Sequence, residues 1–257
     1  MKSSGFRVVL LVAVVMAAGA LRADEEAFQQ QPVDLFAAID RGDIDVQLIA
    51  RDARRGNVLI ENNTGRPLTV ELPDAFAAVL AQLGGGQFGG GRGGGGLGGG
   101  RGGGVGGAQG LGGGFGGGGL GGGGLGGGGA FFNVAPGRVG RIPVATVCLE
   151  HGKREPRPQM TYKIVPMGTF TDDPAVAELC RLVGSGELDP MAAQAAAWHL
   201  ADAMSWGELA DKIGRRRLNG TTEPYFTPPQ LQGGMQIAAA ARQRAQVRAR
   251  ASESMNP

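Results

Sequence analysis

The sequence lacks long apolar runs, and it has few aromatic residues. Beyond residues 8–16, no apolar stretch approaches the roughly 20 residues that span a bilayer, so no transmembrane helix is expected in the mature chain. Aromatic residues are 5% of the 257 residues, which predicts a hydrophobic core of modest size. No cysteine stands directly after the first apolar run, which argues against a lipid anchor of the bacterial lipoprotein kind.

The N-terminus has the layout of a secretory signal peptide. Lys2 and Arg7 precede the apolar run, and small residues follow it. Cleavage is expected after Ala23, with Ala20 as the alternative site, and an uncleaved N-terminal anchor is the alternative to both. The predicted location is therefore secreted, periplasmic or at the cell envelope.

The mature chain has almost no net charge. Removal of the leader takes away Lys2, Arg7 and Arg22, which leaves 22 basic against 23 acidic residues. A nucleic-acid partner bound through global positive charge is not expected. We expect instead a protein or a component of the envelope or matrix as partner, and no cofactor.

Glycine is concentrated in one low-complexity tract, since residues 84–129 hold 34 of the 50 glycines. No period of three with proline runs through the tract, which excludes collagen. It also lacks the helix start and the lysine–hydroxyl pair of a phosphate-binding loop, and its two Arg-Gly-Gly triplets, at Arg92 and Arg101, are too few for an RNA-binding tail. We expect a disordered spacer with apolar residues that could self-associate or adhere to a matrix. These residues are Leu97, Val105, Leu111, Phe115, Leu120 and Leu125.

The pattern on either side of the tract predicts an α+β fold. Short β-branched runs separated by Gly/Asn turns, such as residues 46–49, 58–60 and 68–72, are typical of an antiparallel meander. Strand patterns resume at residues 131–134 and 139–147, so the tract is expected to interrupt one small β-sandwich as a surface insertion.

Three helix starts follow the strands. Asp173-Pro174 and Asp189-Pro190 each place a capping carboxylate before a first-turn proline, and Ser205 with Glu208 forms a capping box. A last helix over residues 236–250 is rich in alanine and arginine, and we expect it to be solvated or frayed, the alternative being a docking helix. The expected order is leader 1–23, N-terminal arm 24–43, β-sandwich 44–165 with insertion 84–129, helical unit 166–214, and loop with C-terminal helix 215–257.

The two cysteines allow more than one chemistry. In an exported chain, Cys148 and Cys180 are simply interpreted as a disulfide between the last strand region and the first helix. Helical spacing also places Cys180 on one face with Val176 and Val183, which suits a buried free thiol.

Two short motifs resemble those of bacterial thioester-domain surface proteins. They are Val147-Cys148-Leu149-Glu150 and the segment from Ala193-Gln194 to Trp198. The resemblance implies an internal thioester between Cys148 and Gln194 that captures amines covalently, with Trp198 shielding the bond from water. The chain departs from the family pattern at Val147, which replaces an aromatic residue, and at Ala193, which replaces a threonine. The separation of the two motifs is also shorter than in that family.

The two histidines suggest a further alternative. His151 and His199 lie beside these motifs, and with Cys148 and Asp202 they define a hypothetical zinc site or a Cys-His hydrolase. Histidines without a chemical role are the default, so no metal and no catalytic residue is predicted. The preferred function is an exported, non-enzymatic structural or binding protein; covalent attachment through the thioester is the first alternative and the hydrolase the second.

Overall fold

The computed structural model describes residues 31–81, 108–115 and 130–254. The predicted leader and the glycine-rich segments 82–107 and 116–129 lie outside these ranges. Among the described helices, none has the length and apolar character needed to cross a membrane.

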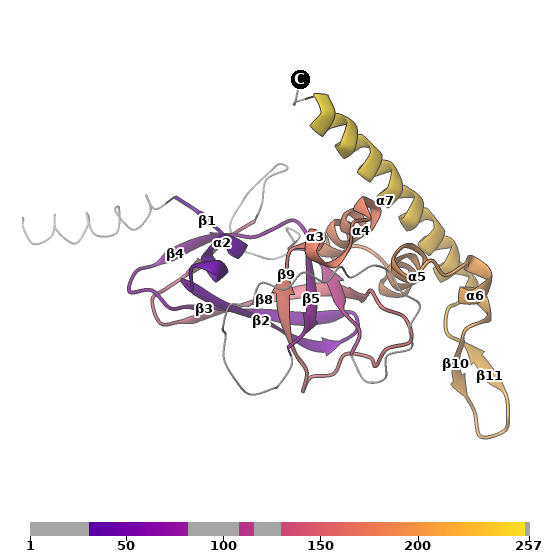
Figure 1. Cartoon of the computed structure of the whole chain (residues 1–257). Coiled ribbons are helices and arrows are strands. Elements are labelled where there is room, and N and C mark those ends of the chain that lie inside the picture. Colours follow the sequence, from indigo (N-terminus) through magenta and orange to yellow (C-terminus); the bar gives the residue numbers. More distant parts are fainter. Residues whose placement is uncertain (1–30, 82–107, 116–129, 255–257) are drawn as a thin grey trace, which may run out of the picture.

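Six antiparallel strands form a closed barrel (Figure 1). In order around the barrel they are β2 (Ile44–Asp52), β3 (Arg55–Asn62), β8 (Val139–Cys148), β6 (Leu111–Gly113), β5 (Phe76–Leu80) and β9 (Thr161–Val165). The expected antiparallel strands are present, but they do not form a sandwich. The reason is β9, which pairs with β2 on one edge and with β5 on the other and so closes the sheet on itself.

The prediction that the whole glycine tract is a surface insertion is wrong, because part of the tract is a barrel strand. Strand β6 lies between β5 and β8, and its Leu111 is fully buried in the barrel interior. A barrel of six strands has a narrow interior that side chains fill, and this interior includes Leu48, Ile60 and Tyr162. Without β6 the sheet would have two free edges.

A second sheet covers one end of the barrel. It consists of β1 (Val33–Asp34), β4 (Leu68–Glu71) and β7 (Phe131–Val134), with β4 in the centre. The short helix α2 (Leu35–Asp40) begins at Asp34, whose carboxylate accepts from the Ala37 amide. Because Leu35 is fully buried in the same core as the barrel, this part of the expected N-terminal arm is integral to the fold.

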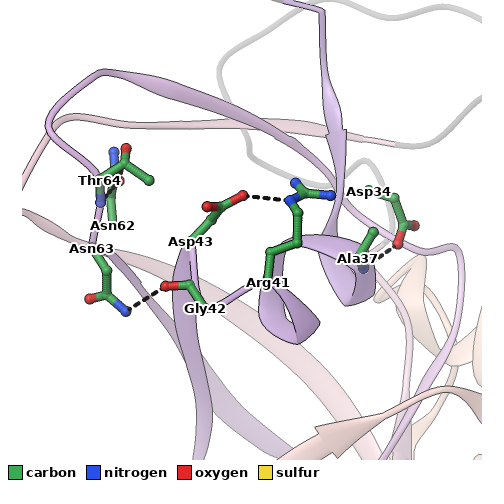
Figure 2. A network of polar contacts seen from close by, with 8 residues as sticks. All are labelled: Asp34, Ala37, Arg41, Gly42, Asp43, Asn62, Asn63 and Thr64. Carbon is green, nitrogen blue, oxygen red and sulfur yellow. Dashed lines mark hydrogen bonds and ion pairs between the residues drawn. The ribbon is translucent and has the colours of Figure 1, made fainter.

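Asn62 fixes the join between the barrel and this second sheet. Its side-chain amide donates to the Val134 and Arg66 carbonyls, and its carbonyl oxygen accepts from the Thr64 amide and hydroxyl. Figure 2 shows the neighbouring Asn63, whose side-chain amide donates to the Gly42 carbonyl in the turn after α2. Asn62-Asn63-Thr64 is also a glycosylation triplet, but the amide nitrogen that would carry a glycan is buried and already donates two hydrogen bonds.

The helices after β9 gather on one side of the barrel, away from α2 (Figure 1). They are α3 (Met167–Phe170), α4 (Pro174–Gly184), α5 (Pro190–Ala201), α6 (Trp206–Asp211) and α7 (Pro228–Ser254), and a hairpin of β10 (Ile213–Arg216) and β11 (Thr222–Pro224) connects the last two. The three predicted helix starts are confirmed. Asp173 and Asp189 cap α4 and α5, and both hydrogen bonds of the capping box at α6 are formed.

Helix α7 is longer than predicted, and it is docked as far as Arg248. Gly234, Ala238, Ala241 and Ala245 are buried against α4 and α5. Small side chains bury little area each, but they allow the helix backbones to approach closely. The buried Glu178 carboxylate on α4 also binds Arg248, which ties α7 to α4. The prediction of a solvated helix therefore holds only for the C-terminal part, which extends away from the body in Figure 1.

Candidate functional site

The structure brings Gln194 and Cys148 together. The Gln194 side-chain oxygen accepts from the Cys148 amide at 2.9 Å, and its nitrogen donates to the Cys148 carbonyl at 2.9 Å. Both residues are buried, one on α5 and the other at the end of β8. The carboxamide therefore contacts the backbone of Cys148 through both of its polar atoms.

The path of β8 explains why these two backbone groups need a partner. On one edge, the Leu149 amide donates to Gly110 next to β6, so the peptide groups of Cys148 point to the opposite edge. On that edge the pairing with β3 ends, and the last bond runs from the Thr146 amide to Arg54. Gln194 thus acts as a one-residue continuation of the missing neighbour strand.

The Cys148 thiol lies on the inner face of β8. It belongs to the core inside the barrel, whereas its neighbours Val147 and Leu149 face the helices. Burial raises the pKa of the Cys148 thiol to about 12, and the negative charge of Glu155 adds to the shift. The thiol is therefore protonated, and hence a weak nucleophile, throughout the physiological range.

Cys180 lies on the outer face of the same sheet. It sits on α4 in the layer between the barrel and the helices, where its sulfur is close to the backbone of Gly112. Both cysteines are free thiols. The wall of the barrel lies between the two side chains, so the structure does not pair them. Cys180 has the environment of the alternative interpretation, a buried free thiol.

Trp198 lies in an aromatic cluster that the sequence did not indicate. Its ring contacts His151, Tyr225 and Phe226 at centroid distances of 4.8, 5.4 and 5.8 Å. The Lys212 ammonium lies over the Trp198 and Tyr225 rings, at 5.1 and 5.2 Å. The sequence does not predict Lys212, Tyr225 and Phe226 as part of a site, because they flank a short hairpin that has no strong strand or helix pattern.

The two histidines are engaged in separate contacts. His151 accepts from the Lys212 ammonium through Nε2 at 2.8 Å, and burial together with that ammonium lowers the pKa of the imidazole. His199 donates from Nδ1 to the Met204 carbonyl at 2.7 Å and accepts from Arg242 through Nε2, which connects α5 to α7. Both ring nitrogens of His199 are thus occupied, so it is not placed as a base for Cys148.

Asp202 ends α5 and accepts from the His151 amide through its carboxylate at 2.9 Å. Burial raises the pKa of this carboxyl to about 6, although the bond from His151 acts in the opposite direction. Within the described part of the chain, no group of three or more His, Cys, Asp or Glu side chains is arranged to hold a metal ion.

A shallow surface pocket lies where the chain leaves β6. Arg51, Arg55 and Arg141 surround it, and Gly114 and Phe115 form part of its wall. The Asp52 carboxylate binds Arg55. Arg51 and Arg55 lie on the adjacent strands β2 and β3, and the pairing of β3 with β8 brings Arg141 from a distant part of the sequence to the same pocket.

Comparison of the chain with protein-family models, with curated proteins and with solved structures finds no match.

Proposed function

We propose that this protein is exported and acts as a non-enzymatic structural or binding protein at the cell envelope or outside the cell. The observation that carries the proposal is the position of β6. Because this strand is built into the barrel wall, the glycine-rich segments 82–107 and 116–129 are both joined to the body at both ends. Both segments therefore start and end at strands of the folded part of the chain, which are β5, β6 and β7.

The contacts of the candidate residues support a non-enzymatic role. The Gln194 carboxamide satisfies backbone groups, the Cys148 thiol is buried inside the barrel, and both ring nitrogens of His199 are bound. Export is supported by the N-terminal sequence alone.

The test replaces the glycine-rich segments without touching β6. One variant carries Gly-Ser sequences of equal length in place of residues 84–107 and 116–129, which removes Leu97, Leu120 and their apolar neighbours but keeps the spacing. We expect an unchanged melting temperature, because both segments keep their lengths and the entropic cost of closing them is therefore the same. We also expect loss of the variant from the envelope fraction of the producing cells. Equal retention of variant and unmodified chain would contradict the proposal.

A second candidate function rests on the proximity of Gln194 and Cys148. If the Cys148 sulfur attacked the side-chain carbonyl carbon of Gln194, the nitrogen would leave as ammonia with the thiol proton, and a thioester would remain. Such a bond transfers its acyl group to an amine of a neighbouring surface and releases the thiol.

Intact mass of the natively exported chain tests this alternative. The thioester requires a mass lower by one ammonia and an adduct after treatment with methylamine, and both signals must vanish in Cys148→Ala. A full mass with two alkylatable thiols after unfolding would leave Gln194 with its backbone-bridging role alone. The same spectrum reports whether the leader is cleaved after Ala23 or Ala20.

A further inference from the structure

Segment 108–115 lies in the barrel wall in the way that a bound peptide lies in a groove. Its backbone pairs with β5 on one side and with β8 on the other. At its start, the Gln109 amide donates to the Arg154 carbonyl, and the Gly110 amide donates to the Glu150 carboxylate at 2.8 Å. The Gln109 side chain adds a bond to the Lys153 carbonyl. We call the space that this segment fills the β5–β8 groove.

Two apolar side chains anchor the segment. Leu111 is fully buried in the barrel interior, and Phe115 is 6% exposed. The Phe115 ring packs against Phe76 of β5 with 4.9 Å between the ring centroids. The groove therefore has one position for a leucine and another for an aromatic residue four places later.

Between the two anchors, the groove accepts only glycine. A Cβ atom on Gly112 would lie 2.5 Å from the Cys180 sulfur, and one on Gly113 would lie 2.7 Å from the Ala145 carbonyl oxygen. On Gly114 it would lie 2.4 Å from the Asp74 carbonyl oxygen. The last two obstacles are backbone atoms, which cannot move aside as a flexible side chain can. The groove is thus selective for Leu-Gly-Gly-Gly followed by an aromatic residue.

The sequence repeats this pattern in part. Leu-Gly-Gly-Gly occurs five times in the chain, starting at Leu83, Leu97, Leu111, Leu120 and Leu125. Only the copy at Leu111 continues with an aromatic residue, since the others are followed by glutamine, arginine or glycine. The buried Phe115 explains why this copy, among five, occupies the groove.

We propose that the β5–β8 groove is a peptide-binding site for Gln-Gly-Leu-Gly-Gly-Gly-Phe strands, and that segment 108–115 of a second copy occupies it when copies exchange strands. The inference rests on the proposed function, because it supplies the contact through which the glycine tract assembles copies. An exchanged pair makes the same groove contacts as the single chain, so the contacts themselves favour neither form.

The lengths of the flanking segments determine when exchange occurs. Residues 82–107 and 116–129 are 26 and 14 residues long, and chains of these lengths can reach at most about 90 Å and 50 Å. These spans are sufficient for a strand to enter a neighbouring molecule. A strand held by such connections has an effective concentration in its own groove on the order of 1 mM. Exchange is therefore expected where the protein is concentrated to that level.

The site is tested with a full-length acceptor variant in which residues 108–115 are replaced by an eight-residue Gly-Ser sequence. The synthetic peptide Ala-Gln-Gly-Leu-Gly-Gly-Gly-Phe should raise its melting temperature or, if the empty variant is unfolded, restore its near-ultraviolet circular dichroism. A control peptide with alanine at the position of Gly114 should bind at least about ten-fold more weakly. Equal effects of the two peptides, or no effect of either, would overturn the proposed site.

The second copy as occupant is tested with the unmodified mature chain. Light and ¹⁵N-labelled protein are mixed at about 1 mM, a level set by the effective concentration above, and mixed dimers are sought by native mass spectrometry after dilution. Mixed dimers that excess peptide suppresses, and the control peptide does not, are expected. Peptide binding without mixed dimers would overturn exchange between copies. The Gly-Ser variant of the flanking segments should still exchange strands, so failure of exchange is distinguishable from failure of envelope retention.

Discussion

At the scale of single residues, buried polar groups in this protein act mainly as substitutes for backbone partners. The Gln194 carboxamide pairs with both backbone groups of Cys148, and the Asn62 amide pairs with the Val134 and Arg66 carbonyls. Buried backbone groups without partners are strongly unfavourable. Each of these side chains stands where a neighbouring strand has ended, which gives it a structural reason to be polar and buried.

Gln194→Leu should therefore destabilise the fold severely. The substitution leaves a buried N–H and a buried C=O of Cys148 without partners, at about 1–3 kcal/mol for each group. We expect a loss of about 2–5 kcal/mol in the free energy of unfolding, measured by denaturant titration. The control is Gln246→Leu, which changes an exposed residue on α7 and should alter stability by less than about 0.5 kcal/mol. Similar losses in both variants would show that the Gln194 bonds contribute nothing specific.

Asp202 should make stability depend on pH between about 4 and 6. Burial raises the pKa of its carboxyl to about 6, so the folded state favours the protonated form. The contribution is fully present below the unfolded pKa near 4 and is lost as the pH rises through 6. Asp202→Asn keeps an acceptor for the His151 amide, and should be about 1–3 kcal/mol more stable than the unmodified chain at about pH 8 but equal to it at about pH 3.5. The exposed Asp211→Asn should show no such gain, and a constant difference at all pH values would contradict the explanation.

At the scale of elements, the glycines of β6 are required sterically, unlike a glycine in a spacer. Composition alone assigns residues 84–129 to a spacer. In the structure, however, the lack of side chains on Gly112, Gly113 and Gly114 allows α4 and the neighbouring strands to pack closely against β6. The signal in the sequence is Phe115, an aromatic residue four places after Leu111. It is too weak to recognise before the partner surface of Phe76 is known.

Gly114→Ala should be strongly destabilising. Its Cβ would meet the carbonyl oxygens of Asp74 and Cys180 at 2.4 and 2.9 Å, and the backbone before β5 or that of α4 would have to shift. We expect a loss of about 1–3 kcal/mol, as for other overpacked sites. The matched control is Gly65→Ala, because nothing lies within 4 Å of its Cβ position. If thermal unfolding shows equal midpoints for the two variants, the close packing of β6 is not important for stability.

Helix α7 docks through small residues, and this explains why its pattern predicted little burial. Ala241 is fully buried, whereas Ala249 is exposed on the same helix. Ala241→Leu should lose about 1–3 kcal/mol, since the added carbon atoms have no space between α7 and its neighbours. Ala249→Leu should stay within about 0.5 kcal/mol of the unmodified chain in the same denaturant titration. Indistinguishable stabilities would mean that α7 is not held at Ala241.

At the scale of the whole molecule, the barrel and the helical layer depend on each other. Strand β8 faces the barrel core with Ile142, Val144 and Cys148, and it faces the helices with Val147. The glycine tract enters the same wall through β6. Removal of the tract is therefore expected to affect the body and not only the surface.

Deletion of residues 84–129 tests this dependence. It removes β6 and the buried Leu111, which opens the barrel between β5 and β8. We expect a fall of at least about 10 °C in melting temperature, or failure to fold, since several kcal/mol are lost and each is worth about 2–4 °C in a chain of this size. The equal-length Gly-Ser variant, which retains residues 108–115, should melt within about 2 °C of the unmodified chain. An intact melting transition after the full deletion would contradict the role of β6.

The sequence by itself determined the local elements. The strands β2, β3, β4, β7 and β8, and the starts of α4, α5 and α6, follow from alternation and from capping residues, which act over a few neighbouring positions. Only the tertiary structure decided the closure of the barrel, the use of Leu111 and Phe115 as anchors, and the partner of Gln194. These depend on which edges and surfaces meet across long separations in the chain, and no periodicity within one segment encodes such a meeting.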